Sequence, residues 1–233
     1  MTERWAFRPA RWGYALAALL VLALVAWLVG FSSVLGVRTV DVAGEHSLTA
    51  DQVRAAAGIR PGTPLSRLDL AAVSRRLREV APIRTVSVSR SYPATVTIRI
   101  TERVAVGYRP VDPAGSGGPV LLLDRDDVAF RTVAAVPAKL PRLLVPADGA
   151  AADAAALVAG TLPAKILAKV ASVTAPSEES VTLSLRDGRS VLWGGTDRSP
   201  DKARLLAVLL GQPGRYFDLS DPSAVTSRLD PGN

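Results

Sequence analysis

An uninterrupted apolar segment near the N-terminus constrains this chain more than any other feature. From Gly13 to Phe31 the sequence holds 19 residues without a charged side chain. A helix of that length is about 28 Å long, close to the hydrocarbon thickness of a bilayer. Trp12 and Tyr14 lie at one end and Trp27 lies near the other, as aromatic residues do at membrane interfaces. We therefore expect a single transmembrane helix over residues 13–31.

The charges that flank this segment predict its orientation. Arg4, Arg8 and Arg11 precede it, whereas the first basic residue after it is Arg38. Because cytoplasmic flanks of membrane helices are rich in Lys and Arg, we expect residues 1–12 to form a cytoplasmic tail and the bulk of the chain to be extracytoplasmic. The alternative is a cleaved signal peptide, which the length of the segment and the lack of a small-residue cleavage site disfavour.

Composition argues against several kinds of chemistry. The chain has no cysteine and a single histidine, His46, so disulfide frameworks, thiolate metal sites and multi-histidine metal sites are excluded. The net charge is +7, but the arginines are scattered among acids and no basic segment interleaves with aromatics, which argues against nucleic acid as a partner. No serine lies in a G-x-S-x-G setting. We expect no catalytic residue, no metal and no cofactor.

The segment after the apolar helix begins with a strand and a helix. Residues 37–43 alternate apolar and polar side chains, which is typical of a half-buried strand. Thr49 and Gln52 have the spacing of a capping box, and Gly58 stands where a helix of this length would end. His46 falls in the turn between the two elements, and we expect it at the surface.

A second helix and two strands complete this first region. Asp69 is a suitable N-cap for a helix with an apolar stripe, and Pro82 ends it. Valines and isoleucines then alternate with polar residues in two strands, joined by a turn at Tyr92-Pro93. The predicted order is β-α-α-β-β.

Beyond residue 112 the pattern is mostly β. Two strands flank a turn at Asp124 to Asp127, and residues 140–145 resemble an edge segment because Pro141 cannot donate to a ladder. Residues 149–172 are alanine-rich and predict a helix interrupted by Pro163. A hairpin at Asp187-Gly188, a helix over residues 200–210 and two closing strands follow.

These motifs together resemble the FtsQ/DivIB family of bacterial cell division proteins. The matching segments of the first region are VDVAGEHSLTADQV and VSVSRSYPATVTIRITER, the latter ending in Glu102-Arg103. Those of the second are LLLDRDDVAF, LPRLLV, Trp193-Gly194 before a helix that contains Lys202, and a closing FDLS. The resemblance covers the whole chain. It implies an α+β fold with a transmembrane helix, a POTRA domain over residues 37–104, and a mainly antiparallel β domain over residues 105–233 with a C-terminal helix and closing strands.

The resemblance also implies a function. Family members are non-enzymatic divisome scaffolds at the division septum, which bind FtsB-like and FtsL-like membrane proteins and other divisome components and help control septal peptidoglycan synthesis. The expected mechanism is β-augmentation, in which a partner segment adds to an exposed strand edge. In the family the partner binds the last strands, which transfers here to Tyr216, Phe217, Ser220, Asp221, Ala224, Val225, Thr226, Ser227 and Arg228.

A second partner edge is implied by the POTRA resemblance. The strand over residues 84–90 is an edge in that domain family, and its exposed residues here would be Thr85, Ser87, Ser89 and Arg90. The alternative is that this polar face is simply solvated. Likewise, Glu102-Arg103 can be interpreted as an ordinary exposed pair that contributes little to stability.

Two other classes of function are alternatives to a scaffold. A membrane-anchored cell-wall enzyme would need convergent carboxylates, and the acidic group Asp124, Asp126 and Asp127 is better interpreted as a solvated turn. A sensor of wall ligands would need an aromatic pocket, for which Trp193, Tyr216 and Phe217 are the candidates.

Overall fold

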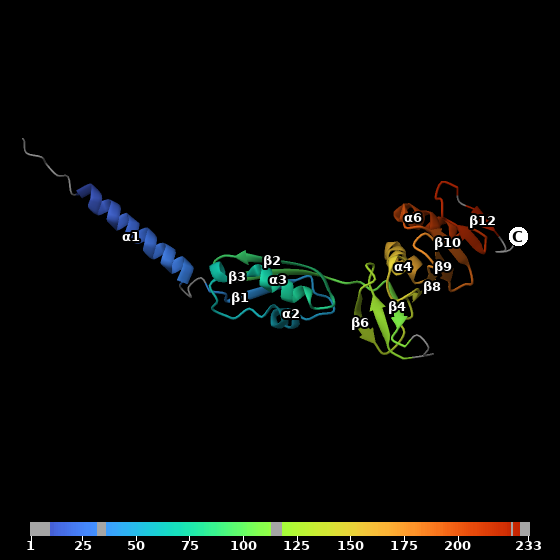
Figure 1. Ribbon diagram of the computed structural model, residues 1–233, viewed down its shortest axis with the longest axis horizontal. Coiled ribbons are helices and arrows are strands. Elements are labelled where there is room, and N and C mark those ends of the chain that lie inside the picture. The colour runs from blue at the N-terminus through green and yellow to red at the C-terminus, as the bar shows by residue number, and fades with distance from the viewer. Residues whose placement is uncertain (1–9, 32–35, 113–117, 225, 229–233) are drawn as a thin grey trace, which may run out of the picture. The chain divides into compact units, whose positions relative to one another are not determined.

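The chain is organised as two units joined in sequence (Figure 1). A computed structural model describes residues 10–31, 36–112, 118–224 and 226–228. The N-terminal unit is Met1–Glu102 and the C-terminal unit is Arg103–Asn233. Each unit has its own buried hydrophobic cluster.

The apolar segment forms helix α1, Ala10–Phe31. Leu16, Leu19 and Leu20 on this helix are each more than half exposed. Within the described part of the chain, no helix combines the length and the apolar character that crossing a membrane requires. The transmembrane assignment of residues 13–31 therefore stays a prediction from the sequence.

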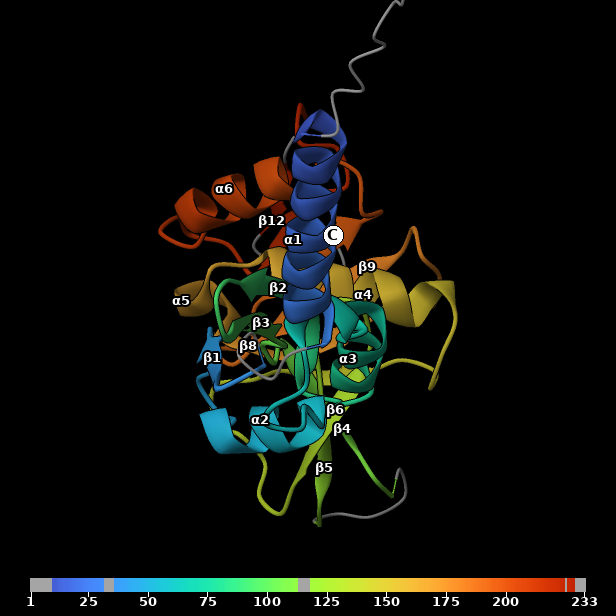
Figure 2. The same cartoon turned by 90° about the vertical axis from the view of Figure 1, so that its left-hand side faces the viewer.

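The rest of the N-terminal unit is a three-stranded sheet with two helices on one face (Figures 1 and 2). The elements are β1 (Thr39–Ala43), α2 (Ala50–Ala57), the short 3₁₀ helix η2 (Leu65–Arg67), α3 (Leu70–Arg78), β2 (Ile83–Ser91) and β3 (Thr95–Glu102). The strand order is β1-β3-β2, with β1 parallel and β2 antiparallel to β3. The predicted β-α-α-β-β order is confirmed.

The helix boundaries of this unit follow from the capping residues. The Thr49 side chain accepts from the Gln52 N–H while the Gln52 side chain accepts from the Thr49 N–H, so the predicted capping box is present. Gly58 ends α2 in the left-handed conformation, at φ 61°. Asp69 caps α3 by accepting from the Ala72 N–H at 2.9 Å. These caps satisfy backbone donors and acceptors that helix ends leave free.

Glu102 closes the N-terminal unit with a carboxylate clamp. Its oxygens accept hydrogen bonds from the backbone N–H groups of His46, Ser47 and Leu48 at 2.7–3.0 Å, and from the Ser47 hydroxyl. Burial alone would raise the pKa of Glu102, but these hydrogen bonds outweigh it and lower the pKa from 4.5 to about 2. The interpretation of Glu102 as an ordinary exposed side chain is wrong, because the carboxylate fixes the turn between β1 and α2.

The Glu102→Gln substitution should reveal this clamp. A neutral amide accepts weaker hydrogen bonds than a carboxylate, so we expect a loss of about 2 kcal/mol in unfolding free energy at pH 7. The stabilisation by Glu102 is complete above the unfolded pKa of 4.5 and is lost as the pH falls from there towards 2. Urea denaturation at pH 7 and pH 3 measures both effects. A variant whose deficit is as large at pH 3 as at pH 7 would contradict the clamp.

The C-terminal unit is built on one mixed sheet of nine strands within the described residues. Its strands are β4 (Gly107–Pro110), β5 (Val120–Leu123), β6 (Ala129–Val133), β7 (Arg142–Leu144), β8 (Val170–Thr174), β9 (Val181–Leu185), β10 (Ser190–Gly194), β11 (Tyr216–Asp218) and β12 (Thr226–Arg228). Its helices are α4 (Ala150–Thr161), α5 (Ala164–Leu167) and α6 (Ser199–Leu209). The strand order is β12-β11-β10-β9-β8-β7-β4-β5-β6.

The predicted α+β class is confirmed, but the sheet is more mixed than expected. The pairs β10–β11, β4–β7 and β7–β8 are parallel, and the other five pairs between described strands are antiparallel. Parallel neighbours need a long crossover connection, which here contains α6 between β10 and β11. The sequence pattern identifies strands but not their direction.

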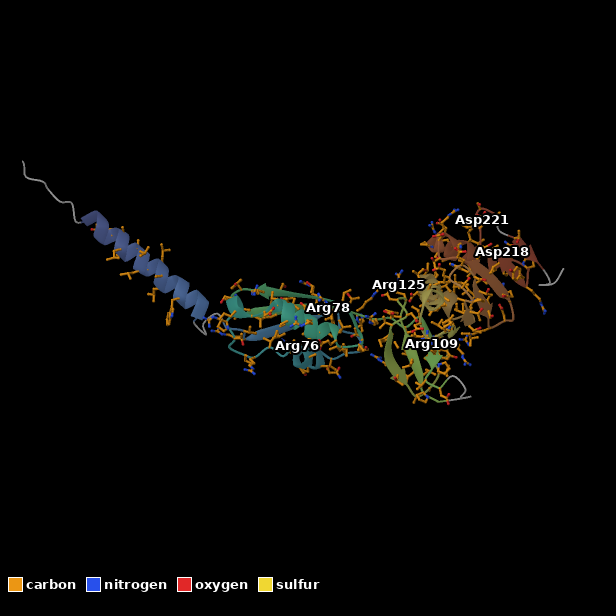
Figure 3. The ribbon with its side chains drawn as sticks, viewed as in Figure 1. Arg76, Arg78, Arg109, Arg125, Asp218 and Asp221 are labelled. Carbon is orange, nitrogen blue, oxygen red and sulfur yellow. The ribbon has the colours of Figure 1, made fainter. Side chains whose placement is uncertain are left out.

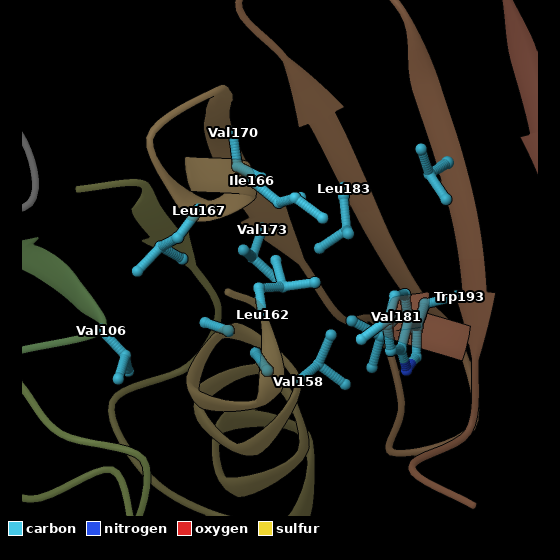
Figure 4. Packing of buried hydrophobic residues seen from close by; sticks show 14 of the residues in the cluster. Val106, Val158, Leu162, Ile166, Leu167, Val170, Val173, Val181, Leu183 and Trp193 are labelled. Carbon is cyan, nitrogen blue, oxygen red and sulfur yellow. The ribbon is translucent and has the colours of Figure 1, made fainter. Parts of the chain in front are cut away.

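One face of the sheet carries the core. Alternate residues of β7 to β11, such as Val173, Leu183 and Trp193, are fully buried on the side where α4 packs (Figure 4). The small alanines of α4 let its backbone approach the strands closely. On the opposite face the intervening residues, such as Ser172 and Thr182, are half-buried. The hydrophobic cluster is therefore one-sided.

Two element predictions in this unit are wrong. The segment 140–145 is not an edge, because β7 lies inside the sheet between β4 and β8. Pro141 lies just before the strand, where its carbonyl accepts from the Tyr108 N–H at 3.0 Å and no donor is needed. The alanine-rich segment also ends as a helix earlier than predicted, since β8 begins at Val170.

Two of the three aspartates in the acidic turn between β5 and β6 are withdrawn from solvent, whereas Asp126 is exposed. Asp124 is 1% exposed, accepts from the N–H groups of Asp126 and Val128 at 3.0 Å, and pairs with Arg103 at 2.5 Å. Asp127 has a φ of 54° and pairs with Arg109 at 3.0 Å. The Asp124 and Asp127 carboxylates thus shape the hairpin and hold two arginines. The solvated interpretation is wrong for Asp124, Asp127 and Arg103 and is correct for Asp126.

Candidate partner-binding edge

The last strand, β12, forms one border of the nine-stranded sheet. It pairs antiparallel with β11, with Phe217 opposite Ser227 and Asp218 opposite Thr226. No described strand pairs with its other side. Thr226 and Ser227 are exposed. An unpaired strand of this kind presents backbone donors and acceptors to an added strand.

The segment between β11 and β12 is organised by two aspartates (Figure 3). The Asp218 carboxylate accepts from the N–H and hydroxyl of Ser220 at 2.9 and 2.6 Å. Asp221 accepts from the hydroxyl and N–H of Ser223 at 2.5 and 2.8 Å, and these bonds lower the pKa of Asp221. Each aspartate therefore stabilises a local turn, and together the turns return the chain to pair as β12.

This segment lies directly against the end of β10. Gly194 has a φ of 72°, and a Cβ atom built there would lie 2.9 Å from the Ser220 Cβ. The pairing of β9 with β10 is irregular at the same point, between Leu192 and Gly194. Any larger residue at position 194 would push the Ser220 backbone away, so the glycine is required for this close approach.

A pair of glycine substitutions separates this contact from backbone strain. Gly188 has a similar φ of 86° but open space around its Cβ position. We expect Gly188→Ala to cost about 1 kcal/mol and Gly194→Ala about 2 kcal/mol more, because only the second adds a steric conflict. Urea denaturation followed by Trp193 fluorescence, with the other tryptophans replaced by phenylalanine, measures both. Equal costs for the two variants would contradict the contact with Ser220.

A buried lysine stabilises the end of β10, next to the segment that leads into β12. The Lys202 ammonium, 2% exposed, donates to the carbonyls of Trp193 and Gly195 at 2.8 and 2.9 Å. The Trp193 indole N–H donates to the Ser199 hydroxyl at 3.0 Å. Burial lowers the pKa of Lys202. These bonds join the start of α6 to the end of β10, beside the close approach at Gly194.

The structure sorts the predicted binding residues into different roles. Phe217 is fully buried and belongs to the core, so its side chain is not available to a partner. Tyr216 is half-buried, whereas Ser220, Asp221, Ala224, Thr226 and Ser227 are exposed or nearly so. Arg228 contributes its backbone to β12, and Val225 lies outside the described residues. Trp193 is also buried, so two of the three aromatic candidates for the alternative sensor function belong to the core and do not line a pocket.

The predicted second edge lies on β2. This strand pairs with β3 and with no other described strand. Thr85 and Ser87 are exposed and Ser89 is half-buried. The Arg90 guanidinium donates to the carbonyls of Leu65 and Leu68 at 2.6 and 2.7 Å, so it holds η2 to the sheet. Arg90 therefore has a structural role, and the other three residues remain candidates.

The roles of Lys202 and Gly194 as supports of the edge were not predicted from the sequence. A signal for Lys202 was present, because it falls on the buried stripe of α6 with Ser199, Ala203 and Leu206. A charged residue on an apolar stripe indicates a buried hydrogen-bonding role. No local signal identifies the contact between Gly194 and Ser220, which depends on a crossover connection.

Comparison with known proteins identifies the family to which this architecture belongs. Residues 35–103 match the family model for the FtsQ-type POTRA domain, and residues 115–220 match that for the C-terminal domain of the cell division protein FtsQ/DivIB. A cell division protein FtsQ of Streptomyces collinus is 37% identical over 246 residues, covering 94% of this chain and 91% of that protein. The chain belongs to the FtsQ family.

Other FtsQ proteins extend this relationship. The FtsQ of Mycolicibacterium smegmatis is 40% identical over 215 residues, which cover 91% of this chain and 62% of that protein. The FtsQ of Mycobacterium tuberculosis strain H37Rv is 38% identical over 219 residues, covering 91% and 68% respectively. The chain thus spans about two thirds of the length of these mycobacterial FtsQ proteins. The match to the C-terminal model ends at Ser220, so β12 lies beyond it.

Proposed function

We propose that this FtsQ-family chain is a non-enzymatic scaffold of the divisome that binds FtsB-like and FtsL-like division proteins. The observation that carries the proposal is the unpaired side of β12, with Thr226 and Ser227 exposed. A partner segment would add as a tenth strand, its main chain bonding to β12 and its alternate side chains giving specificity. By bridging these partners, the scaffold would help control septal peptidoglycan synthesis.

We infer a type II membrane topology for this scaffold at the division septum. Residues 1–12 would be a cytoplasmic tail, 13–31 a transmembrane helix, 37–104 the POTRA domain and 105–233 the β domain. The support is the uncharged sequence of residues 13–31 and the arginines before it. Because the chain has no cysteine, single cysteines placed at Thr2 and Glu45 can be labelled with an impermeant maleimide in intact cells. We expect labelling of the cysteine at position 45 and not of the cysteine at position 2. The opposite result would reverse the inferred topology.

Calorimetry tests the partner-binding edge. The full chain in nanodiscs is titrated with the extracytoplasmic segment of the cognate FtsB-like protein. We expect the truncation after Ser220 to abolish binding and Val225→Asp to weaken it at least tenfold, because the first removes β12 and the second places a charge beside it. The same charge on the other candidate edge, in Ser87→Asp, should leave the affinity unchanged.

Other outcomes have distinct meanings. Binding that survives the truncation but is lost in Ser87→Asp, with circular dichroism unchanged, would move the partner to the β2 edge. That edge is the second candidate, because β2 also has an unpaired side among the described strands. No binding by the unaltered chain would reject the scaffold function proposed for this pair of proteins.

A further inference from the structure

A cavity opens in the C-terminal unit away from the β12 edge. The strands β4, β7 and β8 are neighbours and run parallel, so their carboxyl ends lie at one border of the sheet. A cavity of about 730 Å³ lies there, lined by residues 109–110, 142–147 and 174–176. Its volume is in the range of small-molecule sites. Crevices at the carboxyl ends of parallel strands are common ligand sites in α/β sheets.

Arg142 brings an uncompensated charge to this cavity. Among the described residues its side chain forms no hydrogen bond or ion pair, and its Nε atom is buried without an acceptor. Arg109, the other arginine in the wall, donates to Asp127 at 3.0 Å and to the Ala147 carbonyl at 2.8 Å, although its Nε also lacks an acceptor. Because Asp127 balances Arg109, Arg142 leaves the cavity with one positive charge.

The other residues that line the cavity limit the chemical class of ligand that it can bind. Pro110, Pro146 and Pro176 carry no backbone N–H, so they cannot bond an anion. Leu144 is 45% exposed on the same wall. A ligand would therefore place an acceptor group on Arg142 and an apolar body on the prolines and Leu144. A singly charged carboxylate matches one free guanidinium, whereas a phosphate dianion would be left partly unpaired.

We propose that this cavity binds a carboxylate carried on a short aliphatic body, with Arg142 as the group that pairs with it. The site lies on β4, β7 and β8, whereas the candidate partner edge is β12, so the proposal does not depend on the scaffold function. Figure 3 shows Arg109, on β4, apart from Asp218 and Asp221, which organise the segment before β12. The source of the carboxylate can be an acidic side chain of a peptide or a free acid.

Ligand-observed NMR on the full chain in nanodiscs tests the site. The probe is 4-methylpentanoate, compared with 4-methylpentanamide and inorganic phosphate. We expect saturation transfer to the methyl groups of the acid, with about tenfold weaker binding of the amide and no competition by phosphate at equal concentration. Arg142→Gln should weaken binding of the acid about tenfold. Arg215→Gln makes the same change at an exposed arginine outside the cavity wall and should leave binding unchanged.

A second variant distinguishes loss of the binding site from loss of folding. Leu144→Glu keeps Arg142 and supplies a carboxylate from the wall itself, so it should abolish binding while circular dichroism stays unchanged. Displacement of the acid by acetyl-Leu-Glu-Leu-amide, but not by its Gln counterpart, would identify a peptide source, and failure of both peptides would identify a free acid. Equal binding of acid and amide, competition by phosphate, or full binding by Arg142→Gln would overturn the proposal.

Discussion

The Gly44→Ala substitution should destabilise the N-terminal unit by at least about 3 kcal/mol, the largest effect expected in this unit. Gly44 directly follows β1 and has a φ of 93°, a conformation that alanine rarely adopts. A Cβ atom there would also collide with the backbone carbonyl oxygen of Ile100 on β3. Since β1 pairs with β3 along its whole length, relief of the collision requires these two strands to separate.

The matched control is Gly62→Ala in the same unit. Gly62 has a φ of 79°, but nothing lies within 4 Å of its Cβ position, so we expect a loss of about 1 kcal/mol from backbone strain alone. Hydrogen-exchange mass spectrometry on peptides from α2 and α3 reports the unfolding free energy of this unit separately. Similar losses in the two variants would show that β3 moves aside at little cost.

The Lys202→Met substitution should cost the C-terminal unit about 3 kcal/mol. Methionine nearly preserves the shape of the side chain but leaves the Trp193 and Gly195 carbonyls without the donor they have now. Each unsatisfied buried acceptor costs about 1–3 kcal/mol, and removal of a desolvated charge offsets part of that loss. Trp193 fluorescence during urea denaturation measures the change.

An exposed lysine provides the comparison. Lys165 lies on α5 with its side chain in solvent, so Lys165→Met should change the unfolding free energy by less than about 0.5 kcal/mol. If Lys202→Met were as stable as the unaltered chain, the two hydrogen bonds would contribute nothing beyond the cost of burying the ammonium. A destabilised Lys202→Met with unchanged partner affinity would separate support of the core from support of the edge.

Features that depend on nearby residues were predictable from the sequence. The capping box of Thr49 and Gln52, the N-cap Asp69 and the end of α2 at Gly58 are each determined within about one helical turn. The hairpin at Asp187-Gly188 is similarly local. The family resemblance was confirmed because such local motifs appear in the expected order along the chain.

Features that depend on distant residues were not predictable. The sequence pattern indicated a solvated turn at Asp124, because Arg103, its ion-pair partner, lies 21 positions earlier and no local pattern reveals it. The burial of β7 between two parallel strands requires pairings with β4 and β8 that no short pattern encodes. The candidate edge falls between these cases, since its strands follow local patterns while its support by Lys202 and Gly194 is not local.

The place of β12 in the sheet has a consequence for quality control in the cell. β12 pairs with β11, and β11 is held beside β10 only after the crossover through α6 has been completed. β12 is also the last of the described strands along the sequence, so this border of the sheet is missing from any chain that stops before residue 226. A protein that adds to β12 would therefore bind only chains in which β10, β11 and β12 have paired. Assembly at this edge would select chains whose sheet has formed and leave unfolded chains to proteolysis.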